Sequence, residues 1–77
     1  MSLTKRWREL TEPTVASAPD RYGVYELGDG SGNSLGMAVG VLRDGLKEEL
    51  AYGDAQQVRW IVAHSRDHAD RLLEEHS

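Results

Sequence analysis

The chain has 77 residues, of which 39% are hydrophobic and 29% are charged, and it carries a net charge of −4. This composition is typical of one small soluble domain and excludes a disordered chain. The absence of cysteine excludes disulfides and thiolate metal sites and favours a cytoplasmic location. No apolar run approaches the ~18 residues of a membrane span, and no secretory signal is visible.

The charges are uneven along the chain. Residues 1–25 carry four basic and three acidic side chains, whereas residues 26–77 carry five basic and ten acidic ones. A domain that binds phosphates usually has a basic excess, because cation contacts drive the salt-dependent part of binding. The net charge therefore does not support nucleic acid as a partner. Acidic surfaces are also expected in proteins from high-salt cells.

Residues 3–10 are predicted to form a short helix, because their apolar residues recur at helical spacing: Leu3, Trp7 and Leu10. Pro13 and Pro19 then bracket an irregular connector. This helix would bury Trp7 and expose Lys5, Arg6 and Arg8. The same basic residues around an aromatic ring also suit contact with single-stranded nucleic acid, and both interpretations stay open.

Two predicted strands follow. Residues 22–27 are rich in strand formers, residues 28–33 have the composition of a turn, and residues 35–42 return as the second strand of an antiparallel hairpin. In the second strand the bulky Met37, Val39 and Val41 alternate with small residues, so one face is nearly bare. A bare face lets another element or a ligand approach the backbone closely.

A helix is predicted from Asp44, as N-cap, to about Tyr52, with Gly53 as its C-cap residue. Residues 57–63 form a third predicted strand, and Ser65 caps a last helix that runs to about Glu75. The order α-β-β-α-β-α gives an α+β fold, a small three-stranded sheet flanked by helices. We expect a single domain over residues 1–77, with an N-terminal helix and connector at 1–18 and the core at 19–77.

Two short triplets, Gly23-Val24-Tyr25 and Ala38-Val39-Gly40, lie in the two strands of the predicted hairpin, and a helix follows them. This order resembles the core of the GIY-YIG nuclease family. The resemblance implies that residues 19–77 form a GIY-YIG-like domain in which two strands carry the triplets. The chain also looks similar to small uncharacterised haloarchaeal proteins of this type.

The resemblance also implies a site, and this chain departs from it. Tyr25 would position or activate the attacking water, but Ala38 stands where the family has a second tyrosine, and Gly45 where it has an arginine. Arg43 is a poor substitute, since residues two apart on a helix point to different faces. Glu74, or less favourably Glu75, would hold Mg²⁺. In the plainer interpretation Tyr25 packs in the core and Glu74 is a solvated charge.

These losses predict a catalytically degenerate domain that acts as a binding or interaction module, with nucleic acid or another protein as its ligand and no cofactor. One alternative is an endonuclease that uses Tyr25 and Glu74 on Mg²⁺. Another is a homo-oligomer with no nucleic-acid role, whose partner covers the bare strand face.

Two further groups of residues resemble parts of metal sites, and we expect neither to be one. His64 and His68 are four apart but lie across the expected start of the last helix, and a structural zinc site needs four ligands. Asp29, Ser31 and Asn33 alternate with glycine, but the later positions of a calcium loop do not match. A hairpin turn accounts for them.

Overall fold

The computed structural model of the protein describes Leu3 and residues 5–76. Its elements in chain order are β1 (Arg8–Glu9), α1 (Glu12–Ser17), β2 (Tyr22–Gly28), β3 (Ser34–Val41), α2 (Leu42–Tyr52), β4 (Gln57–Val62) and α3 (Arg66–His76). The strands form one antiparallel sheet in the order β1-β4-β2-β3. The fold is therefore α+β, as predicted, with β2 and β4 at the centre of the sheet.

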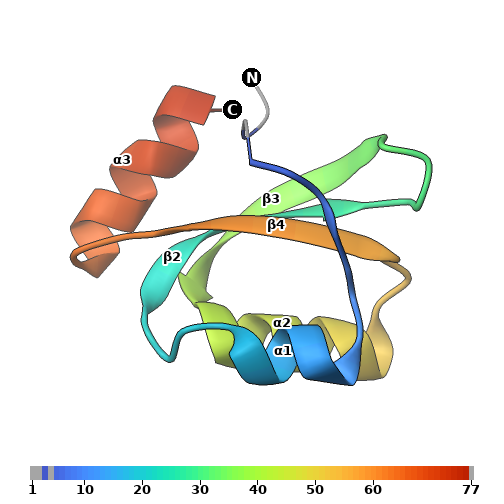
Figure 1. The fold of residues 1–77 in the computed structure, drawn as a ribbon. Coiled ribbons are helices and arrows are strands. Elements are labelled where there is room, and N and C mark those ends of the chain that lie inside the picture. The colour runs from blue at the N-terminus through green and yellow to red at the C-terminus, as the bar shows by residue number, and fades with distance from the viewer. Residues whose placement is uncertain (1–2, 4, 77) are drawn as a thin grey trace.

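The helices cover the two faces of the sheet unequally. Figure 1 shows α1 and α2 side by side on one face and α3 on the other. Because successive strand residues point to opposite faces, β2 contributes Tyr25 and Leu27 to the core under α1 and α2, and Val24 to the core under α3. The domain thus has two thin hydrophobic cores separated by the sheet.

The expected N-terminal helix is wrong. Within the described residues, the only regular structure before Leu10 is strand β1, and the helix lies later, at Glu12–Ser17. Leu3 packs in the core under α3, whereas Leu10 packs in the core under α1 and α2. The spacing of Leu3 and Leu10 therefore reflects a chain that crosses the edge of the sheet. Because this segment contributes strand β1, the sheet has four strands, and the expected count of three is wrong.

The segment expected to be an irregular connector forms α1 for a local reason. Pro13 lies in the first turn, where its missing N–H removes no helical hydrogen bond. Thr11 is the N-cap, and its hydroxyl oxygen accepts from the Thr14 N–H at 3.4 Å. The proline that argues against a helix thus marks where this one begins.

The later elements match the prediction within a few residues. The Gly53 N–H donates to the Glu49 carbonyl at 2.8 Å and closes α2, and the Ser65 hydroxyl oxygen accepts from the His68 N–H at 3.1 Å at the start of α3. The expected cap at Asp44 is wrong: α2 begins at Leu42 directly after β3, with no side-chain cap. Asp44 lies in the first turn instead, where its charge suits the helix dipole.

Across the described part of the chain, none of the helices combines the length and apolar character needed to cross a bilayer.

Candidate functional site

The hairpin brings the two triplets side by side. In β2 and β3 the opposed pairs are Gly23 with Gly40, Val24 with Val39, and Tyr25 with Ala38. Tyr25 packs against the core that contains Leu46 of α2, so residues 25 and 38 both face α2. The structure therefore brings together the two positions that sequence reasoning paired, although only one of them carries a phenol.

The ring of Tyr25 occupies the space beside Gly45. A Cβ built on Gly45 would lie 2.6 Å from the Tyr25 hydroxyl oxygen and 2.8 Å from its Cζ. Ordinary contacts between heavy atoms are about 3.5–4.0 Å, so any larger residue at position 45 displaces the ring. Arg43 does not replace a missing arginine here, because its Nε donates to the Ala18 carbonyl at 3.1 Å.

A pocket of about 370 Å³ adjoins Tyr25 and takes its charged groups from two helices. Asp44 and Glu48 come from α2, and Arg66 comes from the first turn of α3. The two carboxylates outnumber the guanidinium, so the pocket has an acidic lining. Such a lining disfavours a phosphodiester, which carries a negative charge on every phosphate.

Burial raises the pKa of the Tyr25 phenol, and the negative charges of Glu49 and Glu48 raise this pKa further. Each of these effects disfavours the phenolate. Tyr25 therefore stays protonated at neutral pH, so its hydroxyl can serve as a hydrogen-bond donor but is a poor general base.

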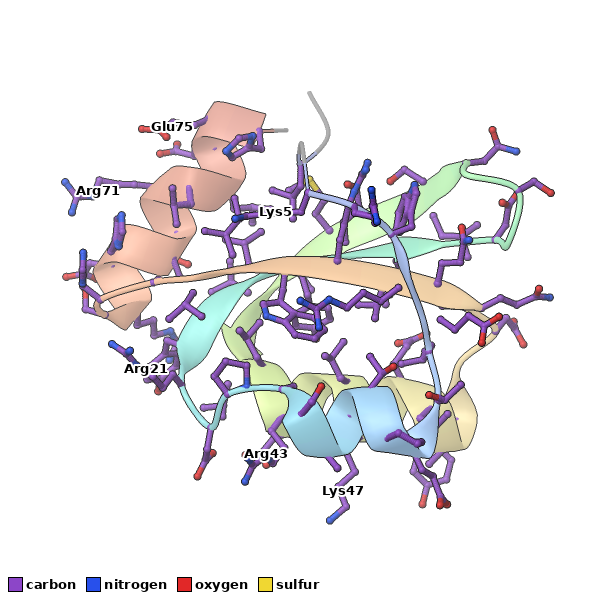
Figure 2. The ribbon with its side chains drawn as sticks, viewed as in Figure 1. Lys5, Arg21, Arg43, Lys47, Arg71 and Glu75 are labelled. Carbon is purple, nitrogen blue, oxygen red and sulfur yellow. The ribbon has the colours of Figure 1, made fainter. Side chains whose placement is uncertain are left out.

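Glu74 does not lie in the same site as Tyr25. It lies on α3, which packs on the face of the sheet opposite to the one that Tyr25 faces. Glu75 lies on the same distant part of α3 (Figure 2). Among the described residues, no three His, Cys, Asp or Glu side chains are placed to hold a metal ion. The described residues thus do not fit the Mg²⁺ site that the resemblance implied.

The structure also settles the surroundings of the two weak metal motifs. The His64 and His68 rings stack with centroids 4.9 Å apart, and the His64 N–H donates to His68 Nδ1 at 3.0 Å. Asp29 accepts from the Ser31 N–H at 2.8 Å and from the side chain of Asn33 at 3.0 Å. These bonds lower the pKa of the Asp29 carboxyl, the Ser31 backbone contact most. The turn is held by Asp29 itself.

Sequence reasoning missed Glu26, whose side chain is only 1% exposed. Its Oε1 accepts from Arg59 Nε at 2.7 Å and from the Leu3 N–H at 3.1 Å. Arg59 also donates to the Lys5 carbonyl at 3.1 Å and lies 3.9 Å from the centre of the Trp7 ring. The one available signal was that Glu26 shares a strand face with Val24. This network holds the N-terminal segment against the α3 face of the sheet.

The N-terminal segment delivers its basic side chains to the edge of β4. Lys5, Arg6 and Arg8 are exposed and line a pocket of about 760 Å³, together with Trp60, Ile61 and Val62. The Arg8 guanidinium lies 4.5 Å from the centre of the Trp60 ring, a cation–π contact. We call this surface, defined by these six residues, the basic edge. Sequence reasoning identified its three cations but placed them on a helix.

Comparison with known proteins gives a family and no function. Searches of curated proteins and of solved structures found no match to this chain. A family model described as a domain of unknown function, DUF7508, matches residues 1–77. The chain therefore belongs to the DUF7508 family over its full given length.

Proposed function

We propose that this protein is a non-catalytic binding module whose ligand is anionic and is held at the basic edge, on a degenerate GIY-YIG-like domain. The observation that carries the proposal is the convergence of Lys5, Arg6 and Arg8 on one pocket of an otherwise acidic chain. With these three cations set aside, six basic residues remain against thirteen acidic ones. Positive charge concentrated at one edge favours negatively charged partners there.

The surroundings of Tyr25 support the loss of catalysis. The missing arginine of a nuclease-type site normally stabilises charge on the phosphate, and loss of such a group costs about 10²–10³ in rate. Here position 45 has no room for an arginine side chain while the Tyr25 ring is in place. Three further features argue against endonuclease activity. The pocket beside Tyr25 is acidic, the phenol stays protonated, and Tyr25 and Glu74 lie on opposite faces of the sheet.

The proposal is tested by binding, with two double variants of equal charge. Lys5→Gln/Arg6→Gln neutralises the basic edge, and Lys47→Gln/Arg71→Gln neutralises two exposed residues elsewhere. Figure 2 shows Lys5 on the α3 side of the sheet, Lys47 on the opposite side and Arg71 on the outside of α3. Neither Lys5 nor Arg6 uses its side chain in a hydrogen bond or ion pair within the described structure. Both double variants carry a net charge of −6, two units below the −4 of the parent.

We expect a fluorescently labelled polyglutamate, or a labelled oligodeoxythymidine, to bind the parent and the Lys47/Arg71 control alike at low salt. The Lys5/Arg6 variant should bind roughly two- to fivefold more weakly for each charge removed, and the affinity of the parent should fall as salt rises. Equal binding by both variants, or no binding of either ligand, contradicts the proposal. Incubation of the parent with plasmid and Mg²⁺ should give no nicks.

Self-association is a second candidate role, because β3 is an outer strand of the sheet and its glycines leave part of its face uncovered. A Cβ at Gly36 or Gly40 would meet nothing within 4 Å, and Leu35 is 55% exposed. Edge strands of this kind favour pairing between copies. A sedimentation mass that rises with protein concentration, and that returns to the monomer value in Leu35→Lys, would support this role.

A further inference from the structure

The outer edge of β4 is covered by β1 at only two of its six residues. β1 pairs with β4 at Gln57 and Val58 alone, so among the described residues the edge from Arg59 to Val62 has no strand partner. The Ala63 N–H donates to the Tyr22 carbonyl at 2.9 Å, which makes Gly23 and Val62 a non-hydrogen-bonded pair. In such a pair the backbone groups point away from the neighbouring strand.

The same alternation fixes the direction of the backbone at Trp60, two residues before Val62. The N–H and C=O groups of both residues therefore point outward, along the line that β1 would follow if it were longer. They lie in the basic edge, between the exposed side chains of Lys5, Arg6 and Arg8. An incoming strand would meet two donors, two acceptors and three cations at one place.

Resting on the proposed function, we infer that the anionic ligand is an extended acidic segment of a partner protein, which adds to the sheet as a strand beside Trp60–Val62. Main-chain hydrogen bonds give such strand addition its affinity, and side chains at the edge select the sequence. Lys5, Arg6 and Arg8 would select carboxylates. At about 3.3 Å per residue, the uncovered part of β4 accommodates a strand of roughly four residues.

The chemistry of the edge favours a polypeptide over a nucleic acid. A strand satisfies both the N–H and the C=O groups of Trp60 and Val62, whereas a phosphate accepts from the N–H groups and is repelled by the carbonyl oxygens. Base stacking needs an open aromatic face. Here the guanidiniums of Arg8 and Arg59 lie over the rings of Trp60 and Trp7.

A second copy of this chain does not supply the required strand. Its own bare edge strand, Ser34–Val41, contains no charged residue and so offers nothing to the three cations. Its acidic runs, including Glu48–Glu49 and Glu74–Glu75, lie in helices. The occupant with both an extended backbone and negative charge is therefore a different protein.

The test is an NMR titration of the isotopically labelled full chain with a short peptide of alternating glutamate and threonine. We expect shift changes at the Trp60 and Val62 amides, and hydrogen-exchange protection of both in the complex. The same peptide with alternate backbone amides methylated keeps its charge but loses ladder donors, and it should bind at least tenfold more weakly. Val62→Pro removes one outward N–H and should weaken binding likewise, while Val39→Pro at the bare β3 edge serves as the matched control.

The outcomes separate this inference from the proposed function. Binding of the peptide without protection at Trp60 and Val62, or equal binding of the methylated peptide, overturns strand addition and leaves the anion-binding role intact. Binding of oligodeoxythymidine at the basic edge, with no binding of the acidic peptide, also overturns strand addition and makes nucleic acid the ligand. If neither ligand binds, both the inference and the proposed function fail.

Discussion

Glu26 is the residue on which the N-terminal segment depends. Its buried carboxylate accepts from both Arg59 and Leu3, and the Arg59 side chain is itself only 14% exposed. Glu26→Gln keeps the volume but removes the charge, so the Arg59 guanidinium loses its buried counter-charge. We expect the free energy of unfolding to fall by roughly 2–3 kcal/mol. Urea unfolding measures this, and exchange of the Leu3 amide should become faster.

The control for this variant is Glu75→Gln, the same change on the exposed outside of α3 (Figure 2). Exposed substitutions of this kind usually alter stability by no more than about 0.5 kcal/mol. If the two variants unfold at the same urea concentration, the ion pair between Glu26 and Arg59 does not stabilise the fold.

The pH dependence of stability at high pH should depend on Tyr25. Its pKa is raised in the folded state by burial and then by Glu49 and Glu48. Above pH ~10 the unfolded chain therefore releases this proton before the folded chain does. The protonated phenol therefore makes its full contribution to stability below pH ~10, and this contribution is lost as pH rises through the raised pKa of folded Tyr25.

Ultraviolet difference absorbance of tyrosinate should show a phase above pH ~10 that is missing in Tyr25→Phe. The variant should also lose less stability than the parent between pH ~10 and pH ~11. Glu49→Gln should lower the Tyr25 pKa only in part, since burial is the larger cause. An identical tyrosinate titration in parent and Tyr25→Phe would contradict this account of the pocket.

At the scale of elements, α2 packs on β2 through the contact between Gly45 and Tyr25. Ala is favoured over Gly in a helix interior by about 1 kcal/mol, so Gly45→Ala would ordinarily stabilise α2. Here the added methyl group displaces the Tyr25 ring. We expect no gain in the parent and a gain of about 1 kcal/mol in the Tyr25→Ala background, measured by urea unfolding of all four proteins. An equal gain in both backgrounds would show that the contact is not limiting.

The elements differ in how far the sequence could predict them. The hairpin, β4 and α3 follow from strand formers, glycine turns and an apolar helical stripe, which are local signals. The helix predicted for the N-terminal segment is wrong because Leu3 and Leu10 are buried on opposite faces of the sheet. Only tertiary structure distinguishes that arrangement from an amphipathic helix.

The candidate site divides in the same way. The pairing of Tyr25 with Ala38 follows from the hairpin register, so the two triplets could be placed from the sequence. The relation of Glu74 to Tyr25 could not, because it depends on which face of the sheet α3 covers. The basic edge could not be predicted either, because it depends on β1 being too short to cover β4. The length of an edge strand leaves no signal in the composition of the sequence.

At the scale of the whole molecule, the charges are segregated. Three cations lie on the basic edge, and the rest of the chain carries a net charge of −7. Many of these acidic residues are exposed on α2 and α3, including Asp44, Glu48, Asp67 and Asp70. Mutual repulsion among them opposes folding, whereas the basic edge attracts an anionic partner. Added salt screens both the repulsion and the attraction. Screening the repulsion raises stability, whereas screening the attraction weakens binding.

We therefore predict opposite salt responses for stability and binding. Raising NaCl from about 0.05 M to about 1 M shortens the screening length from above 10 Å to about 3 Å, so the free energy of unfolding in urea should rise. The ion pair between Glu26 and Arg59 is buried and should be little screened. Over the same range the affinity for polyglutamate should fall.

The Lys47→Gln/Arg71→Gln variant adds net negative charge away from the basic edge, so its stability should rise more steeply with salt than that of the parent. A fall in stability with salt in both proteins would mean that attraction between exposed charges outweighs their repulsion, and that the acidic surface does not oppose folding.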